Sequence, residues 1–134
     1  MRHLTLTLSL ILGLATSVSA EWKNVITSSE INIFVDVDNI RQRDGFVYAD
    51  QIIDLVGQQY QSGIYRSVKQ KLEIDCIARG YRILTSYNFD GYGGSGNSIK
   101  LQPNNCGGVN MCYPRKNTIG YIVKEKICQH QGFY

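Results

Sequence analysis

The chain has 134 residues, with 14 Lys or Arg against 11 Asp or Glu and a formal net charge of +3. An excess of basic side chains this small argues against a nucleic-acid partner and against attachment to a membrane by charge alone. The four cysteines form an even number, which in an exported chain indicates two disulfides.

The first 20 residues have the pattern of a secretory signal peptide. A basic start at Arg2 and a short apolar run over residues 4–15 precede small residues at 18–20, as at a cleavage site. We therefore expect residues 21–134 to form one exported domain. No later segment of the sequence is apolar for long enough to span a bilayer.

Short apolar segments separated by turn residues predict an antiparallel sheet for the first half of this domain. Asp36 caps a turn or a single helical turn, and Asp44-Gly45 is a strong signal for a hairpin. After Ile52 the third predicted strand has apolar residues at both odd and even positions, so both of its faces are apolar. This fits either a central strand or a bend at a bulge. The strands predicted here cover residues 22–27, 31–36 and 46–56.

The sheet is organised around residues 64–76, IYRSVKQKLEIDC, where apolar and charged side chains alternate. Alternation with a period of two indicates a strand with one buried face and one solvent-facing side. We expect the inner face to carry Val68, Gln70, Leu72, Ile74 and Cys76. The outer face is expected to carry Tyr65, Ser67, Lys69, Lys71, Glu73 and Asp75.

A returning strand is predicted for residues 81–89. Residues 90–96, DGYGGSG, are rich in glycine, and we expect a mobile loop there, followed by a short strand at 98–101. The loop lacks the lysine of a phosphate-binding loop, so that function is not predicted. The returning strand is expected to place five side chains on one shared face: Tyr81, Ile83, Thr85, Tyr87 and Phe89.

Residues 117–130, NTIGYIVKEKICQH, are the only segment with a helical pattern. Asn117 is the expected N-cap. Cys128 lies about 100° round the helix from Ile127, so either the helix rolls to bring Tyr121 and Cys128 inward or its last turn is distorted. A final strand is the alternative to a helix. The apolar stripe at helical spacing comprises Ile119, Ile122, Val123 and Ile127.

Four cysteines allow three pairings, and the layout of the elements favours one of them. Cys106 and Cys112 flank a short segment with two glycines, which makes a local bridge easy to close. Cys76 ends the inner face of the central strand, and a bridge to Cys128 would hold the helix against the sheet. We therefore predict the pairs 76–128 and 106–112.

The sequence offers little for catalysis. His130 is the only histidine after the signal peptide, and it lies close to Cys128, which we take to be oxidised. One histidine near the C-terminus does not supply a Ser/His/Asp arrangement, and disulfide-bonded cysteines do not bind metal. Asp36 and Asp38 lack the further oxygen ligands of a calcium site. We predict a protein that is not an enzyme and that has no metal and no cofactor.

Basic side chains on the central strand form the first candidate surface. Lys69 and Lys71 point outward, and Arg66 lies at the start of the strand. The simpler interpretation is a solvated face balanced by Glu73 and Asp75; the functional one is a basic patch for a polyanion or an acidic protein. Further basic residues are Arg82 on the returning strand and, near the C-terminus, Arg115, Lys116, Lys124 and Lys126.

Several short segments share a pattern with a known family. They are Trp22, Phe34-Val35-Asp36, Asp38-Asn39-Ile40, residues 65–70 running into Ile74-Asp75-Cys76, and the helix ending in Ile127-Cys128. Together they resemble the surface-adhesin protein E family of Gram-negative bacteria. The resemblance covers nearly all of residues 21–134, and residues 67–76 are its most specific part.

The resemblance implies an α+β fold, in which a bent antiparallel sheet of about six strands carries a C-terminal helix on its concave face, held by the bridge that matches Cys76–Cys128. The characterised adhesin of the family is a surface lipoprotein that dimerises and binds host vitronectin, laminin and plasminogen. Its vitronectin-binding stretch matches residues 65–71, so the partner-binding residues carried over are Arg66, Lys69 and Lys71. The resemblance therefore implies a protein partner, such as a host extracellular-matrix protein, and a homodimer.

The chain departs from that adhesin at three places. No cysteine for lipid attachment follows the signal peptide, so we expect a periplasmic or secreted protein. Cys106 and Cys112 are additions, in a region that is strongly basic in the adhesin and rich in glycine here. The chain ends in Tyr134, whereas plasminogen favours a C-terminal lysine.

Two functions from different classes follow. The first is an adhesin-like protein-binding module that acts through the outer face of the sheet. The second is a periplasmic stress or defence protein, such as an inhibitor of a host hydrolase, that inserts residues 91–100 (GYGGSGNSIK) into an enzyme cleft. Reversing the charges of Lys69 and Lys71 separates the two, because it should remove the first activity and spare the second.

Overall fold

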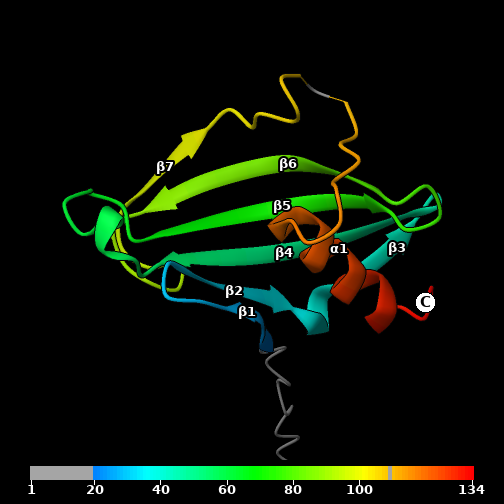
Figure 1. Cartoon of the computed structure of the whole chain (residues 1–134), viewed down its shortest axis with the longest axis horizontal. Coiled ribbons are helices and arrows are strands. Elements are labelled where there is room, and N and C mark those ends of the chain that lie inside the picture. The colour runs from blue at the N-terminus through cyan, green and yellow to red at the C-terminus, as the bar shows by residue number, and fades with distance from the viewer. Residues whose placement is uncertain (1–19, 109) are drawn as a thin grey trace, which may run out of the picture.

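The structure, a computed structural model, describes residues 20–108 and 110–134. The predicted signal peptide lies outside the described residues, except for Ala20. Within them, a curved antiparallel sheet carries one helix near the C-terminus, and that helix covers one face of the sheet (Figure 1). The predicted α+β fold is confirmed.

The strands follow the order β1-β2-β4-β5-β6-β7 across the sheet, and β3 pairs with β4 to make the seventh strand. Every pairing is antiparallel. The elements are β1 (Trp22–Thr27), β2 (Ile31–Asp36), the 3-10 turn η1 (Val37–Asn39), β3 (Arg41–Arg43), β4 (Phe46–Leu55), the 3-10 turn η2 (Gln58–Tyr60), β5 (Ser67–Asp75), β6 (Gly80–Phe89), β7 (Ser98–Leu101) and the helix α1 (Ile119–His130).

The turns of the first half form where the sequence predicts them. Ser28 Oγ accepts from the Ile31 amide at 3.0 Å between β1 and β2, and Asp36 Oδ1 accepts from the Asp38 amide at 3.2 Å to cap η1. Between β3 and β4, Asp44 and Gly45 have φ angles of 54° and 83°. Two successive positive φ angles make the tight turn that best fits the twist of a hairpin.

The inner face of the sheet carries the core, with β4 and β5 at its centre. Val47 lies opposite Ile74 and Ala49 lies opposite Leu72, and all four side chains are buried. The predicted inner face of β5 is therefore confirmed. No register shift interrupts β4 against either neighbour, so β4 is the central strand and not a strand bent at a bulge.

One extra residue in β6 changes the face on which its side chains lie. Lys71 pairs with Thr85 while the next residue, Leu72, pairs with Ile83, so Leu84 has no opposite residue on β5. A bulge of this kind resets the alternation of side chains beyond it. The prediction of one shared face is wrong: Tyr81 and Ile83 pack against the core, whereas Thr85, Tyr87 and Phe89 lie on the outer face.

The helix α1 begins later and rolls further than the apolar stripe predicts. Its N-cap is Thr118, whose Oγ1 accepts from the Tyr121 amide at 3.4 Å, and not Asn117. Ile119 is half exposed, because the helix turns a different face to the sheet. The buried residues of that face are Val123, Lys124, Ile127 and Cys128.

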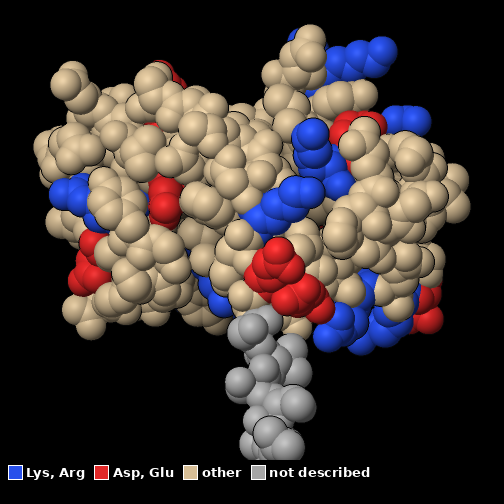
Figure 2. Space-filling model, turned by 90° about the horizontal axis from the view of Figure 1, so that it is seen from below, with Lys and Arg blue, Asp and Glu red and all other residues tan. Residues whose placement is uncertain are grey.

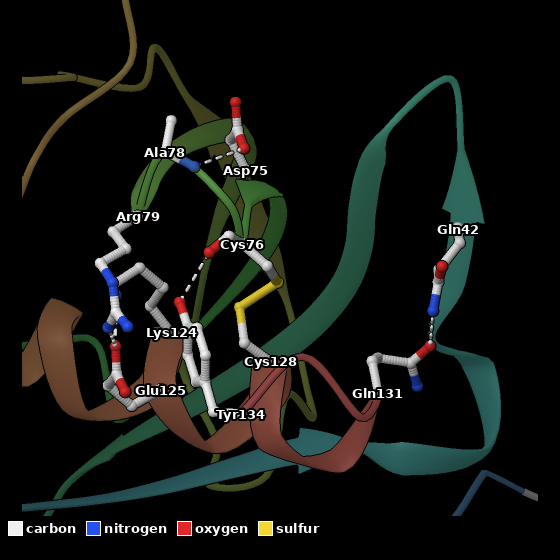
Figure 3. Close-up of a disulfide and its surroundings, with 10 residues drawn as sticks. All are labelled: Gln42, Asp75, Cys76, Ala78, Arg79, Lys124, Glu125, Cys128, Gln131 and Tyr134. Carbon is white, nitrogen blue, oxygen red and sulfur yellow. Dashed lines mark hydrogen bonds and ion pairs between the residues drawn. A yellow bond between two sulfur atoms is a disulfide. The ribbon is translucent and has the colours of Figure 1, made fainter.

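A disulfide joins the last turn of α1 to the residue that follows β5. Cys76 and Cys128 are bonded with their Cα atoms 5.7 Å apart, and Tyr134 Oη donates to the Cys76 carbonyl at 2.8 Å beside them (Figure 3). Cys106 and Cys112 form the second disulfide, and Cys112 also pairs with Tyr81 at the start of β6. Both predicted pairings are confirmed.

Candidate binding surface on the outer face of the sheet

Two grooves run over the outer face of the sheet, opposite α1. The central groove, of about 500 Å³, is lined by Asp50, Lys69, Gln70, Lys71, Thr85, Tyr87, Phe89 and Ser98. The hairpin groove, of about 460 Å³, is lined by Arg41, Gln42, Arg43, Tyr48, Lys71 and Leu84. Lys71 lines both, so the two grooves meet at this side chain.

Lys69 and Lys71 enter the central groove from alternate positions of β5. Lys69 is half-buried, and its Nζ lies 5.7 Å from the centre of the Trp22 ring, within reach of a cation–π interaction. Lys71 is exposed between Asp50 on β4 and Thr85 on β6. Within the described part of the chain neither lysine forms an ion pair, so both ammonium groups are available to a partner.

Arg66 has a different environment from the two lysines. Its guanidinium donates to the carbonyls of Tyr60, Gln61 and Gly63 at 3.1, 3.3 and 2.8 Å. Three such bonds fix the side chain to the turn that follows η2. The structure therefore brings Lys69 and Lys71 together in one groove and places Arg66 outside it, where it stabilises the loop.

Arg82 is also used within the chain. Its guanidinium pairs with Glu73, and the other oxygen of that carboxylate accepts from Tyr48 Oη at 2.9 Å. Glu73 is buried, although the sequence predicts it on a solvated face. A buried carboxylate needs such partners, so this cluster joins β4, β5 and β6 and does not supply a free acidic group.

The basic residues near the C-terminus do not form one surface. Lys124 is 1 % exposed, and its Nζ lies 2.6 Å from Glu125 Oε1, whereas Arg115, Lys116 and Lys126 are exposed. Seen from the side of β1 and β2, Lys and Arg side chains lie mostly over the half of the molecule that carries α1 and β3 (Figure 2).

The glycine-rich loop lies against the outer face at the other end of the sheet. The Gly93 amide donates to Asp54 Oδ1 at 2.8 Å, and the Gly94 amide donates to Ser67 Oγ at 2.9 Å. Ser67 Oγ in turn donates to the Gly91 carbonyl at 2.7 Å. The loop that we expected to be mobile is therefore docked, and it covers Ile52, which explains an apolar residue on the outer face.

Comparison with protein families identifies the chain. The profile of the family described as surface-adhesin protein E matches residues 22–129. The chain belongs to the surface-adhesin protein E family. Comparison with curated protein sequences gave no match.

Solved structures of Haemophilus influenzae protein E have the same fold. Crystal form II is 17 % identical, with a TM-score of 0.65 over 90 % of this chain and 97 % of that one. Protein E from non-typeable Haemophilus influenzae is 18 % identical, with a TM-score of 0.61 over 91 % of this chain and 86 % of that one. At this level of identity the likeness establishes the architecture alone.

Membership of a family of surface adhesins gives this adhesin E-like chain a protein-binding role, and the family is not one of enzymes. Among residues 20–108 and 110–134, no helix has the length and apolar character needed to span a bilayer. The same residues hold no cluster of three or more His, Cys, Asp or Glu side chains suited to a metal ion.

Several residues of the grooves are not anticipated from the sequence. Arg41 and Arg43 line the hairpin groove, and an Arg-Gln-Arg segment in a strand does place two arginines on one face, which is a signal that could have found them. Tyr87 and Phe89 reach the central groove only because of the bulge at Leu84, for which the sequence has no local signal.

Proposed function

We propose that this adhesin E-like chain is exported and binds an acidic segment of a partner protein along the two grooves of its outer face. The observation that carries the proposal is Lys71, which is exposed, shared by both grooves and without an ion pair among the described residues. With Lys69 and the two arginines of β3, it supplies four cations against the single carboxylate of Asp50. Such an excess attracts an acidic partner and orients it.

Aromatic side chains support the same interpretation. Tyr87 and Phe89 line the central groove, and Tyr48 lines the hairpin groove. Arg43 stacks over Tyr48 with 5.0 Å between the guanidinium carbon and the ring centre. Aromatic residues and arginine are enriched at protein–protein interfaces, because they bury a large area while keeping a polar end.

The resemblance supplies the candidate partners. We propose host vitronectin, laminin and plasminogen as the first to test, and a second copy of the chain as a further partner. The edge strand β7 supports the homodimer, because all four of its residues are exposed and Ile99 and Leu101 are among them. Light scattering on the purified chain and on Ile99→Lys checks this, since a dimer through β7 should dissociate in the variant.

The alternative, an inhibitor that inserts the glycine-rich loop into an enzyme, requires that loop to project from the sheet. Gly93 and Gly94 instead donate to Asp54 and Ser67, which hold the loop flat against the outer face. A loop docked on the sheet does not project toward an enzyme cleft. This supports the grooves, and not the loop, as the binding surface.

The test is charge reversal with a matched control. Lys69→Glu/Lys71→Glu changes the net charge by four units in the central groove, and Arg115→Glu/Lys116→Glu makes the same change in an exposed loop outside it. We expect the first variant to bind immobilised vitronectin or laminin at least tenfold more weakly, and the control to bind within about twofold of the wild type. Equal loss in both variants would show attraction by net charge alone, and no loss in the first would refute the proposal.

A further inference from the structure

The two disulfides of the chain differ in how far they are open to solvent. Cys76 and Cys128 are 2 % and 0 % exposed, and both belong to the hydrophobic core between α1 and the sheet. Cys112 is 4 % exposed, but its partner Cys106 is an exposed residue. A disulfide is cleaved by a thiolate that attacks one of its sulfur atoms, so cleavage requires access to that atom. Only the second bridge has a cysteine on the surface.

The turn that carries Cys106 borders open space. The amides of Asn105 and Gly108 each donate to the carbonyl of the other residue at 2.9 Å. Between them, Cys106 and Gly107 have φ angles of 52° and 80°. A Cβ atom at Gly107 or at Gly108 would have no neighbour within 4 Å outside the adjacent residues. Cysteine rarely adopts a positive φ, so the backbone is strained at Cys106, and opening the bridge relieves that strain.

The loop that this bridge closes covers the edge of β6 where β7 does not reach. The strand β7 pairs only with residues 86–89 of β6. Before them, the Asn105 side chain accepts from the Ile83 amide at 2.7 Å and donates to the Ile83 carbonyl at 2.9 Å. Tyr81 and Cys112 exchange two backbone hydrogen bonds of 2.9 and 2.7 Å. The bridge therefore connects two anchors that hold the loop on this edge.

We propose that Cys106–Cys112 is a site of reversible thiol–disulfide exchange with a dithiol reductant, such as a protein with a Cys-X-X-Cys motif. A thiolate of the reductant attacks Cys106 Sγ and forms a mixed disulfide, and Cys112 leaves as a thiolate that takes up a proton. The second thiol of the reductant then attacks its own sulfur in the mixed disulfide and releases Cys106. Two electrons and two protons pass to the chain, which gains two thiols, and the reductant is left with one disulfide.

Opening the bridge acts on the loop through its two anchors. While the bridge is closed, it holds the Asn105 and Cys112 anchors close together. Once it is open, each anchor depends only on its own two hydrogen bonds, to Ile83 and to Tyr81. An open loop has more conformational entropy to lose on docking than a closed one, so reduction shifts the loop away from β6.

The experiment uses dithiothreitol as the probe. The folded chain is incubated with increasing concentrations of this dithiol without denaturant, free thiols are alkylated, and the labelled cysteines are mapped by mass spectrometry. We expect Cys106 and Cys112 to be labelled at a concentration about tenfold lower than Cys76 and Cys128, because the core bridge is not accessible in the folded chain. The proposal is overturned if all four cysteines are labelled together, or if Cys76 and Cys128 are labelled first.

A matched variant and a second measurement complete the test. Cys106→Ala/Cys112→Ala should take up no label at the lower concentration of dithiothreitol, and a label there would overturn the assignment. In the selectively reduced wild type, hydrogen exchange should be faster at the amides of Tyr81 and Ile83, which donate to the loop, and unchanged at the amides of β4. Unchanged exchange at both amides would overturn the release of the loop. The labelling and the exchange of the wild type keep the test valid even if the variant does not fold.

Discussion

Lys124 is a charged residue placed in the core of a small domain. It is 1 % exposed, its ammonium pairs with Glu125, and the rings of Tyr121 and Tyr134 lie 4.8 and 5.8 Å from it. The long stem of the lysine packs as an apolar side chain, while its ammonium group pairs with the Glu125 carboxylate. The same carboxylate also accepts from Arg79, so Glu125 joins two basic residues from different parts of the chain (Figure 3).

Removing the carboxylate should therefore cost more than removing the whole pair. We expect Glu125→Gln to lower the free energy of unfolding by about 3 kcal/mol, because it leaves a buried ammonium without its partner. Lys124→Met/Glu125→Gln should recover most of that loss, since methionine fills a similar volume without charge. Urea denaturation measures both, with the exposed Glu30→Gln as the control, and a double variant no more stable than Glu125→Gln would contradict this account.

Ser67 shows how one small polar residue positions a whole loop. Its side chain is fully buried and bonds to both Gly91 and Gly94. We expect Ser67→Ala to destabilise the domain by about 2 kcal/mol, because it leaves a partly buried amide and a partly buried carbonyl without their partner.

Hydrogen exchange gives the local readout for Ser67. The Gly94 amide should exchange faster in Ser67→Ala. The amides of β4 should lose protection only by the amount that the free energy of unfolding falls. Ser29→Ala, at an exposed turn position, is the control. An unchanged Gly94 amide would mean that Asp54 and the turn alone hold the loop.

At the scale of elements, the two disulfides have different structural roles. The Cys76–Cys128 bridge spans 52 residues and holds α1 on the sheet, whereas Cys106–Cys112 spans 6 and closes one loop. A cross-link stabilises the folded state by lowering the conformational entropy of the unfolded chain, and this effect is larger for a longer loop. The expected contribution to the free energy of unfolding is about 4 kcal/mol for the first bridge and about 2.4 kcal/mol for the second.

Paired alanine variants compare the two bridges. Cys76→Ala/Cys128→Ala should lower the urea midpoint clearly more than Cys106→Ala/Cys112→Ala, because only the first frees the helix from the core. Near-UV circular dichroism should show loss of tertiary packing in the first variant at lower denaturant. Equal midpoints in the two variants would contradict the role of the long bridge as the structural clamp.

Local patterns predict the strands and turns of this sheet well. Apolar and polar side chains alternate along β5 without a register shift against β4, so its inner face follows directly from the odd or even position of each residue. The hairpin is determined by the backbone preference of Asp44-Gly45 alone. The bulge at Leu84 could not be predicted, because Ile83, Leu84 and Thr85 all suit a strand and the shift depends on pairing with β5. The roll of α1 that brings Cys128 inward is one of the two alternatives that the sequence leaves open, and the disulfide to the distant Cys76 decides between them.

The same limit applies to the binding surface. Lys69 and Lys71 are found from parity, since outward lysines on a central strand need no tertiary information. The sequence could not exclude Arg66 from the binding surface, because its three carbonyl partners come within reach only when the loop after η2 is folded. The docked glycine loop depends on Ser67 and Asp54, residues that are not distinctive in the sequence.

At the scale of the whole molecule, the two faces of the sheet differ in what covers them. The helix and the long disulfide close the inner face, and the outer face is left with two grooves that meet at Lys71. A surface of this kind can serve as an adhesin only if it meets host proteins. We therefore propose that the chain acts outside the cell.

The most direct measurement is the accessibility of the chain to added protease in intact cells that produce it, together with its amount in the medium. A periplasmic protein that stays protected serves as the control. We expect the chain to be digested from outside or recovered in the medium while the control survives. A chain that is retained and protected until the outer membrane is opened would contradict adhesion to host proteins.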